Sequence, residues 1–107
     1  MRFKGKVVWI TGASSGIGEA LAHAFHGEGA HVILSARRVD ELNRVANDLR
    51  DGNGEHLVIP LDLADETSLS QAAGLASERF GHVDILVNNA GRTMRATILN
   101  TQMTVFR

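Results

Sequence analysis

The sequence predicts an α/β fold built on a doubly wound parallel sheet of about four strands. Three observations support this: short β-rich apolar runs, helix-like stretches between them, and no repeat, low-complexity segment or linker in the 107 residues. Strands that alternate with helices of this length form parallel β-α-β units with right-handed crossovers. We therefore expect one unit over residues 1–107, with the strand order 3-2-1-4.

Four short apolar runs predict the strands. Continuous runs of this kind are typical of strands that are buried on both faces. Pro60 directly follows the third run and favours a strand end or an edge, because proline donates no ladder hydrogen bond. The predicted strands are Val7–Ile10, Val32–Leu34, Leu57–Ile59 and Ile85–Val87.

The first predicted helix lies between the first two strands and ends near Gly27 and Gly29. His23 and His26 stand three apart on it, a spacing that metal ligands also use. They fall away from the expected apolar face, and no carboxylate-histidine cluster accompanies them, so we predict no metal site. The expected apolar face consists of Ile17, Leu21, Ala24 and Phe25.

The second and third helices follow the second and third strands. Asp40 is expected to cap the second helix, and Asp65 or Thr67 to begin the third, which Gly81 closes. The expected apolar faces are Leu42, Val45, Ala46 and Leu49 in the second helix, and Leu69, Ala72, Ala73, Ala76 and Phe80 in the third.

A glycine-rich turn, Thr11–Gly18, joins the first strand to the first helix. Gly12 permits the tight turn, Gly16 lets backbone approach a pyrophosphate, and Gly18 lets helix pack closely on strand. The free N–H groups and the positive end of the helix attract a diphosphate. An ordinary turn is the alternative, but the strand before and the helix after favour a Rossmann-type dinucleotide site.

These motifs resemble those of the short-chain dehydrogenase/reductases. That family carries T-G-x-x-x-G-x-G after its first strand, matched by Thr11–Gly18, and N-N-A-G after its fourth, matched by Asn88–Gly91. Its Asp after the third strand is matched by Asp62. The resemblance covers essentially the whole chain, and the pattern around Ser35–Arg38 is similar to the DHRS7-type branch.

The resemblance implies a role for each motif. Asp62 and the backbone of Leu63 would contact the adenine ring, and Asn88 would mainly tie the central sheet together. From the residues alone, a turn or helix-entry carboxylate is the alternative for Asp62, and loop capping is the alternative for the two asparagines, compatible with the functional role. The diphosphate side of the predicted site consists of Gly12, Ser14, Ser15, Gly16, Ile17 and Gly18. The adenine-ribose side consists of Asn89, Ala90 and Gly91.

The end of the second strand indicates which dinucleotide binds. An acidic residue about 20 residues past the glycines would bond the ribose 2′-hydroxyl of NAD. This chain has Ala36, Arg37 and Arg38 there, and a guanidinium grips a 2′-phosphate through two parallel hydrogen bonds. With help from the Ser14 hydroxyl, this predicts NADP(H); a solvated surface pair of arginines is the alternative.

The residues that would perform the chemistry are missing from this stretch. Hydride transfer in the family needs a Tyr-x-x-x-Lys pair, a Ser and an Asn, yet this sequence has no Tyr and its last Lys is Lys6. We therefore predict no catalytic residue and no turnover by the 107 residues alone. The full-length protein is expected to act on a small carbonyl or alcohol substrate; a non-catalytic dinucleotide-binding or interaction module is the alternative.

Composition excludes several partners. The net charge is −1 without a basic stripe, which argues against nucleic acid, and no cysteine is present for a disulfide or thiolate metal site. No apolar stretch has the length of a secretory signal or a membrane span, which predicts a cytoplasmic chain. The fourth strand, Ile85–Val87, would form an open edge, and we expect it to promote self-association.

Overall fold

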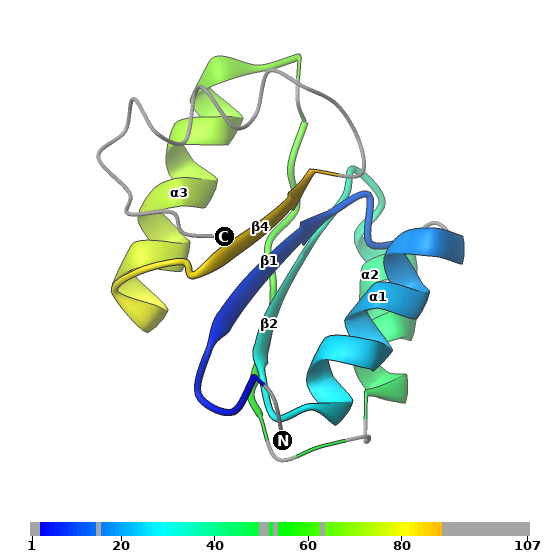
Figure 1. Ribbon diagram of the computed structural model, residues 1–107. Coiled ribbons are helices and arrows are strands. Elements are labelled where there is room, and N and C mark those ends of the chain that lie inside the picture. Colours follow the sequence, from blue (N-terminus) through cyan, green and yellow to red (C-terminus); the bar gives the residue numbers. More distant parts are fainter. Residues whose placement is uncertain (1–2, 15, 50–51, 53, 63, 89–107) are drawn as a thin grey trace.

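The computed structural model describes residues 3–14, 16–49, 52, 54–62 and 64–88. They form one parallel sheet with the order β3-β2-β1-β4, which confirms the predicted topology (Figure 1). No helix in these ranges is long and apolar enough to span a membrane. The elements are β1 (Val7–Thr11), α1 (Gly16–Gly27), β2 (His31–Ser35), α2 (Val39–Asp48), β3 (His56–Val58), α3 (Glu66–Phe80) and β4 (Ile85–Asn88).

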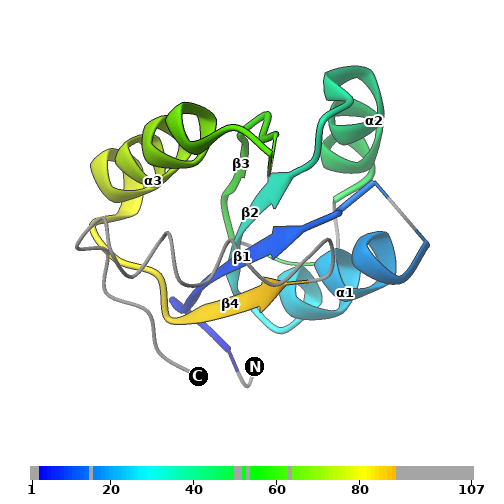
Figure 2. The same cartoon turned by 90° about the horizontal axis from the view of Figure 1, so that it is seen from above.

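The helices form two layers around the sheet. Helices α1 and α2 cover one face and α3 covers the other, as the view from above shows (Figure 2). Strand β1 is central, and its Trp9 lies opposite Ile33 of β2 and Leu86 of β4. This arrangement brings the carboxyl ends of the strands to one edge of the sheet.

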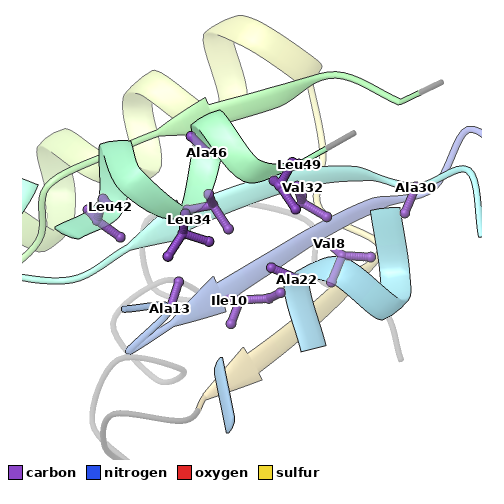
Figure 3. Packing of buried hydrophobic residues seen from close by; sticks show 11 residues of the cluster. Val8, Ile10, Ala13, Ala22, Ala30, Val32, Leu34, Leu42, Ala46 and Leu49 are labelled. Atoms are coloured by element: carbon purple, nitrogen blue, oxygen red, sulfur yellow. The ribbon is translucent and has the colours of Figure 1, made fainter. Parts of the chain in front are cut away.

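Alternate residues of β1 enter different cores, because successive side chains of a strand point to opposite faces. Val7 and Trp9 pack in the core under α3, whereas Val8 and Ile10 pack in the core under α1 and α2 (Figure 3). Each of these side chains is at most 2% exposed. The short apolar runs are therefore buried on both faces, as predicted.

The predicted helix boundaries agree with the structure except at α2. Asp65 caps α3 by accepting a hydrogen bond from the Thr67 N–H at 3.0 Å, and Gly81 ends it with a left-handed φ of 82°. The prediction that Asp40 caps α2 is wrong. Arg38 occupies the cap position without a side-chain bond, and Asp40 lies in the first turn.

Strand β3 ends one residue before the predicted boundary. Ile59 lies outside the strand, although its N–H bonds to the Leu34 carbonyl at 2.9 Å and its side chain is buried. The next residue, Pro60, has no N–H to extend the ladder, so regular pairing ends here.

The predicted buried face of α1 is wrong in part. Its buried residues are Gly18, Ala22 and His26, while Ile17 is 70% exposed. The helix approaches the sheet closely, so small residues occupy the contact and larger ones flank it. Leu21 and Phe25 are the partly buried flank, and Ala24 is exposed.

Candidate functional site

A cavity of about 490 Å³ opens at the carboxyl ends of β1, β2 and β3. Ligands of open α/β sheets bind at this edge. Three segments that are distant in sequence contribute to it, one after each strand. The lining residues are Thr11, Gly12, Ser14, Ser35, Ala36, Arg37, Arg38, Leu61, Asp62 and Ala64.

The glycine turn has the geometry that its sequence predicts. Gly12 has a φ of 65°, a conformation that side chains disfavour. A Cβ on Gly18 would overlap the Gly12 carbonyl oxygen and crowd the backbone of Ala13. A Cβ on Gly16 would meet no described residue within 4 Å, apart from its sequence neighbours and its own helix backbone. Space is therefore left open at Gly16, at the amino-terminal end of α1, an end of a helix that attracts anions.

The two arginines after β2 differ in their partners. Both are exposed and line the cavity. Arg38 lies 3.7 Å from the Asp40 carboxylate, whereas Arg37 has no ion pair with any residue that the structure describes. Arg37 is therefore the better placed of the two to meet an anionic group in the cavity.

Asp62 has the turn role that the sequence left open for it, and its side chain stays accessible. Its Oδ1 accepts a hydrogen bond from the Ala64 N–H, and its own N–H donates to the Ser68 Oγ, both at 3.0 Å. It thus shapes the turn between β3 and α3. Its side chain is exposed and lines the cavity, so the turn role leaves it accessible to a ligand.

Asn88 lies at the junction between β4 and β1. The Thr11 hydroxyl is 3.3 Å from both the Asn88 Oδ1 and the Val87 carbonyl oxygen. Thr11 is buried, so these contacts hold the carboxyl ends of the two strands together. This is the sheet-tying position expected for Asn88.

Glu19 brings a negative charge close to the glycine turn, in the first turn of α1. Its two carboxylate oxygens accept hydrogen bonds from the Arg44 guanidinium at 3.2 Å. These bonds lower the pKa of Glu19, with a smaller contribution from the charge of Arg44. The charge of this carboxylate is thus balanced by the guanidinium of Arg44 on α2.

The structure brings together five of the predicted cofactor residues around the cavity. Gly16, Ile17 and Gly18 stand on the first turn of α1 and do not line it. Ser15, Leu63, Asn89, Ala90 and Gly91 lie outside the described residues. The five are Gly12, Ser14, Arg37, Arg38 and Asp62.

Five further lining residues were absent from the predicted site. Each lies within two residues of a predicted position in the sequence, so extending the three motifs by one or two residues would have found them. They are Thr11, Ser35, Ala36, Leu61 and Ala64.

Comparison with known proteins extends this description. The family model for short chain dehydrogenase matches residues 6–107. Dehydrogenase/reductase SDR family member 7 of Mus musculus is 49% identical over 105 residues, a match that covers 94% of this chain and 31% of the relative. The predicted likeness to the DHRS7-type branch is thereby confirmed. The chain spans about a third of the length of the curated relatives it matches.

Solved structures share the arrangement. L-sorbose reductase from Gluconobacter frateurii, complexed with NADPH and L-sorbose, is similar with a TM-score of 0.78 and 43% identity, over 84% of this chain and 35% of that one. A xylitol dehydrogenase bound to NAD⁺ is similar with a TM-score of 0.81 and 29% identity, over 86% of this chain and 35% of that one. Proteins with either dinucleotide therefore share this fold.

Proposed function

This chain belongs to the short-chain dehydrogenase family, and we propose that residues 1–107 form the NADP(H)-binding part of an oxidoreductase. The observation that carries the proposal is Arg37 beside a cavity at the carboxyl ends of the strands. The full-length protein would transfer hydride between the cofactor and a small carbonyl or alcohol substrate. The family and the fold support a nicotinamide dinucleotide; the residues after β2 support the choice of NADP(H).

The preference for NADP(H) rests on charge. In the β2 part of the cavity the lining residues are Ser35, Ala36, Arg37 and Arg38, and none is acidic. A carboxylate there would repel a 2′-phosphate, whereas the Arg37 guanidinium can bind it through paired hydrogen bonds. Asp40 follows, but Arg38 stands beside its carboxylate.

The other predicted positions would hold the rest of the dinucleotide. The open backbone at Gly16 and the N–H groups of the first turn of α1 would hold the diphosphate. Asp62 and the backbone of Leu63 would meet the adenine ring, and Ser14, which lines the same cavity as the β2 residues, would assist with the phosphate. Ser15, Ile17 and the segment Asn89–Gly91 complete this proposed site.

We assign binding, and no catalytic step, to these 107 residues. The dinucleotide supplies hydride chemistry when bound, but the tyrosine acid and its lysine partner are absent from this sequence. We therefore expect no turnover by residues 1–107 alone. A dinucleotide-binding module without catalysis is the second candidate function.

We also propose that residues 1–107 self-associate through β4. Among the described residues, β4 pairs with β1 alone, and Ile85, Leu86 and Val87 are only partly buried. An unpaired apolar edge recruits other strands. Light scattering over a concentration series would show growth in mass, and a constant monomer mass would refute this.

The experiment that tests the cofactor proposal is calorimetric titration of the chain with NADPH and NADH. Arg37→Ala should weaken NADPH binding about 10- to 150-fold, the loss of a charged hydrogen bond, and leave NADH binding unchanged. Arg38→Ala is the matched control and should have the smaller effect, because Arg38 is paired with Asp40. Equal affinities for both dinucleotides in the unmodified chain would refute the proposal.

A further inference from the structure

A hydrogen bond between two buried side chains joins β1 to the last residue of β2, two residues before Arg37. The Trp9 Nε1–H donates to the Ser35 Oγ at 2.8 Å, and both residues are 0% exposed. Trp9 faces Ile33 across the β1–β2 pair, and Ser35 follows two residues later on β2. The indole therefore anchors the last residue of β2 from the neighbouring strand.

Ser35 is the point where the cavity segments meet. Its carbonyl accepts the Ala13 N–H of the glycine turn at 3.2 Å. The next carbonyl, that of Ala36, accepts the Leu61 N–H at 3.0 Å and so holds the segment after β3. Arg37 follows immediately, with an exposed side chain.

We propose that the Trp9–Ser35 pair is a positioning device for the proposed NADP(H) site, which fixes the backbone from which Arg37 reaches the 2′-phosphate. This inference rests on the proposed function. Trp9 does not line the cavity, so it would act through Ser35 and not by touching the cofactor.

Two physical features make the pair suited to this role. The indole is enclosed in the core under α3, together with Ile33 and Leu61, so it moves little. A buried hydrogen bond that fixes a strand end limits the positions open to the residues that follow it. A guanidinium that binds a phosphate through two bonds depends on such placement, because the bidentate geometry is narrow.

The test is the ratio of NADPH to NADH affinity in variants of the full 107-residue chain. Ser35→Ala, Trp9→Phe and the double variant should each lower this ratio about 3- to 10-fold, less than Arg37→Ala, because the arginine charge remains. Ser35→Thr keeps the hydroxyl and should retain the ratio. Urea unfolding of each variant establishes that it is folded under the assay conditions.

The double variant separates positioning from stability. Ser35→Ala alone leaves the indole N–H buried and unpaired, which destabilises the fold, whereas the double variant leaves no such donor. A lowered ratio in the folded double variant supports the proposal. If the folded double variant keeps the NADPH-to-NADH affinity ratio of the unmodified chain while Arg37→Ala lowers that ratio, the positioning proposal is wrong. If Arg37→Ala leaves the ratio unchanged, the proposed function itself fails, and this inference fails with it.

Discussion

The two ends of the parallel sheet use their polar groups differently. At the amino end, the polar groups bond mainly to one another across the loops. At the carboxyl end, Arg37, Arg38 and Asp62 are exposed around a cavity. We call the amino end of the sheet the closed end and the carboxyl end, where the cavity lies, the open end.

Three side chains close the amino end. The Asp84 Oδ2 accepts the Val7 N–H at 2.8 Å, and the Asp84 N–H donates to the Val7 carbonyl at 2.9 Å. The His31 Nδ1 accepts the Glu55 N–H at 2.9 Å, and the His31 ring stacks on Phe80. These contacts join β1, β2, β3, β4 and the end of α3.

His26 closes the same end from α1. It is 2% exposed, and its Nε2 lies 2.9 Å from the Gly54 carbonyl oxygen. Gly52 and Gly54 lie against this region so closely that a Cβ on either would overlap the backbone of His26 or Ala30. The loop before β3 therefore rests directly on the end of α1.

This difference indicates which substitutions should change stability and which should change binding. Satisfied buried groups stabilise the fold, and removing one partner leaves the other unpaired. Exposed groups around a cavity add little to stability and remain available to a ligand. Changes of buried groups at the amino end should therefore alter unfolding, and changes of exposed groups at the carboxyl end should alter nucleotide affinity.

We expect the largest effect at the glycine turn, because substitutions there should change both stability and nucleotide binding. Gly18→Val should cost about 3 kcal/mol or more and abolish binding of both dinucleotides, because its Cβ would overlap the Gly12 carbonyl. Gly16→Ala is the matched control. Its Cβ meets only open space, so stability should stay the same or rise by about 0.4–1 kcal/mol while dinucleotide affinity falls.

Urea unfolding and calorimetric titration of both variants measure these effects. If Gly16→Ala binds dinucleotide like the unmodified chain, the open space at Gly16 does not receive the diphosphate. If Gly18→Val is as stable as the unmodified chain, the close packing of α1 on β1 does not constrain this position.

His26 tests the closed end. His26→Leu should lower the free energy of unfolding by about 1 kcal/mol, because the Gly54 carbonyl loses its partner, while removal of the buried Nδ1, which has no partner among the described residues, offsets part of the loss. Dinucleotide affinity of the folded variant should not change. His56→Ala is the control, since His56 is exposed at the start of β3 and should alter stability by about 0.5 kcal/mol or less. Weaker dinucleotide binding by folded His26→Leu would show that the two ends are coupled.

The open end was easier to predict from sequence than the closed end. Glycines that a turn requires, and apolar runs that fill two cores, leave local patterns, so the topology and the cavity motifs followed from them. His26 was expected to point away from the core because the apolar face of the helix was assigned to Ile17, Leu21, Ala24 and Phe25. Its bond partner, Gly54, is 28 residues away, and only the folded loop supplies it.

Features without a local sequence pattern also explain the other differences between the predictions and the structure. The Trp9–Ser35 bond joins two strands and has no pattern in either one. The contact face of α1 consists partly of glycine and alanine, which carry a weak apolar signal, so the larger Ile17 was wrongly placed there. Asp40 has the chemistry of a cap, but α2 begins two residues earlier than that role requires.

The smallest expected effect concerns an exposed contact near the open end, between Glu19 of α1 and Arg44 of α2. Hydrogen bonds from Arg44 lower the pKa of Glu19 below its ordinary value of 4.5. A lowered folded-state pKa means that the contact stabilises the protein above the unfolded-state pKa and that this stabilisation is lost as pH falls through the folded-state pKa. We therefore expect a pH-dependent contribution that is present at neutral pH and lost in acid.

Glu19→Gln should reduce the free energy of unfolding slightly near pH 7, and the difference from the unmodified chain should vanish below the folded-state pKa of Glu19. The reduction should be small because the contact is exposed and Arg44 keeps a second partner, Glu41, at 3.1 Å. High salt should diminish this reduction further.

Glu78→Gln is the control, because Glu78 is exposed on α3 and has no ion pair with a described residue. Urea unfolding at several pH values measures both variants, and a Glu19→Gln effect that grows in acid would contradict the expected sign. If Glu19→Gln lowered the free energy of unfolding as much as His26→Leu does, exposed contacts near the open end would stabilise the fold as much as buried bonds at the closed end.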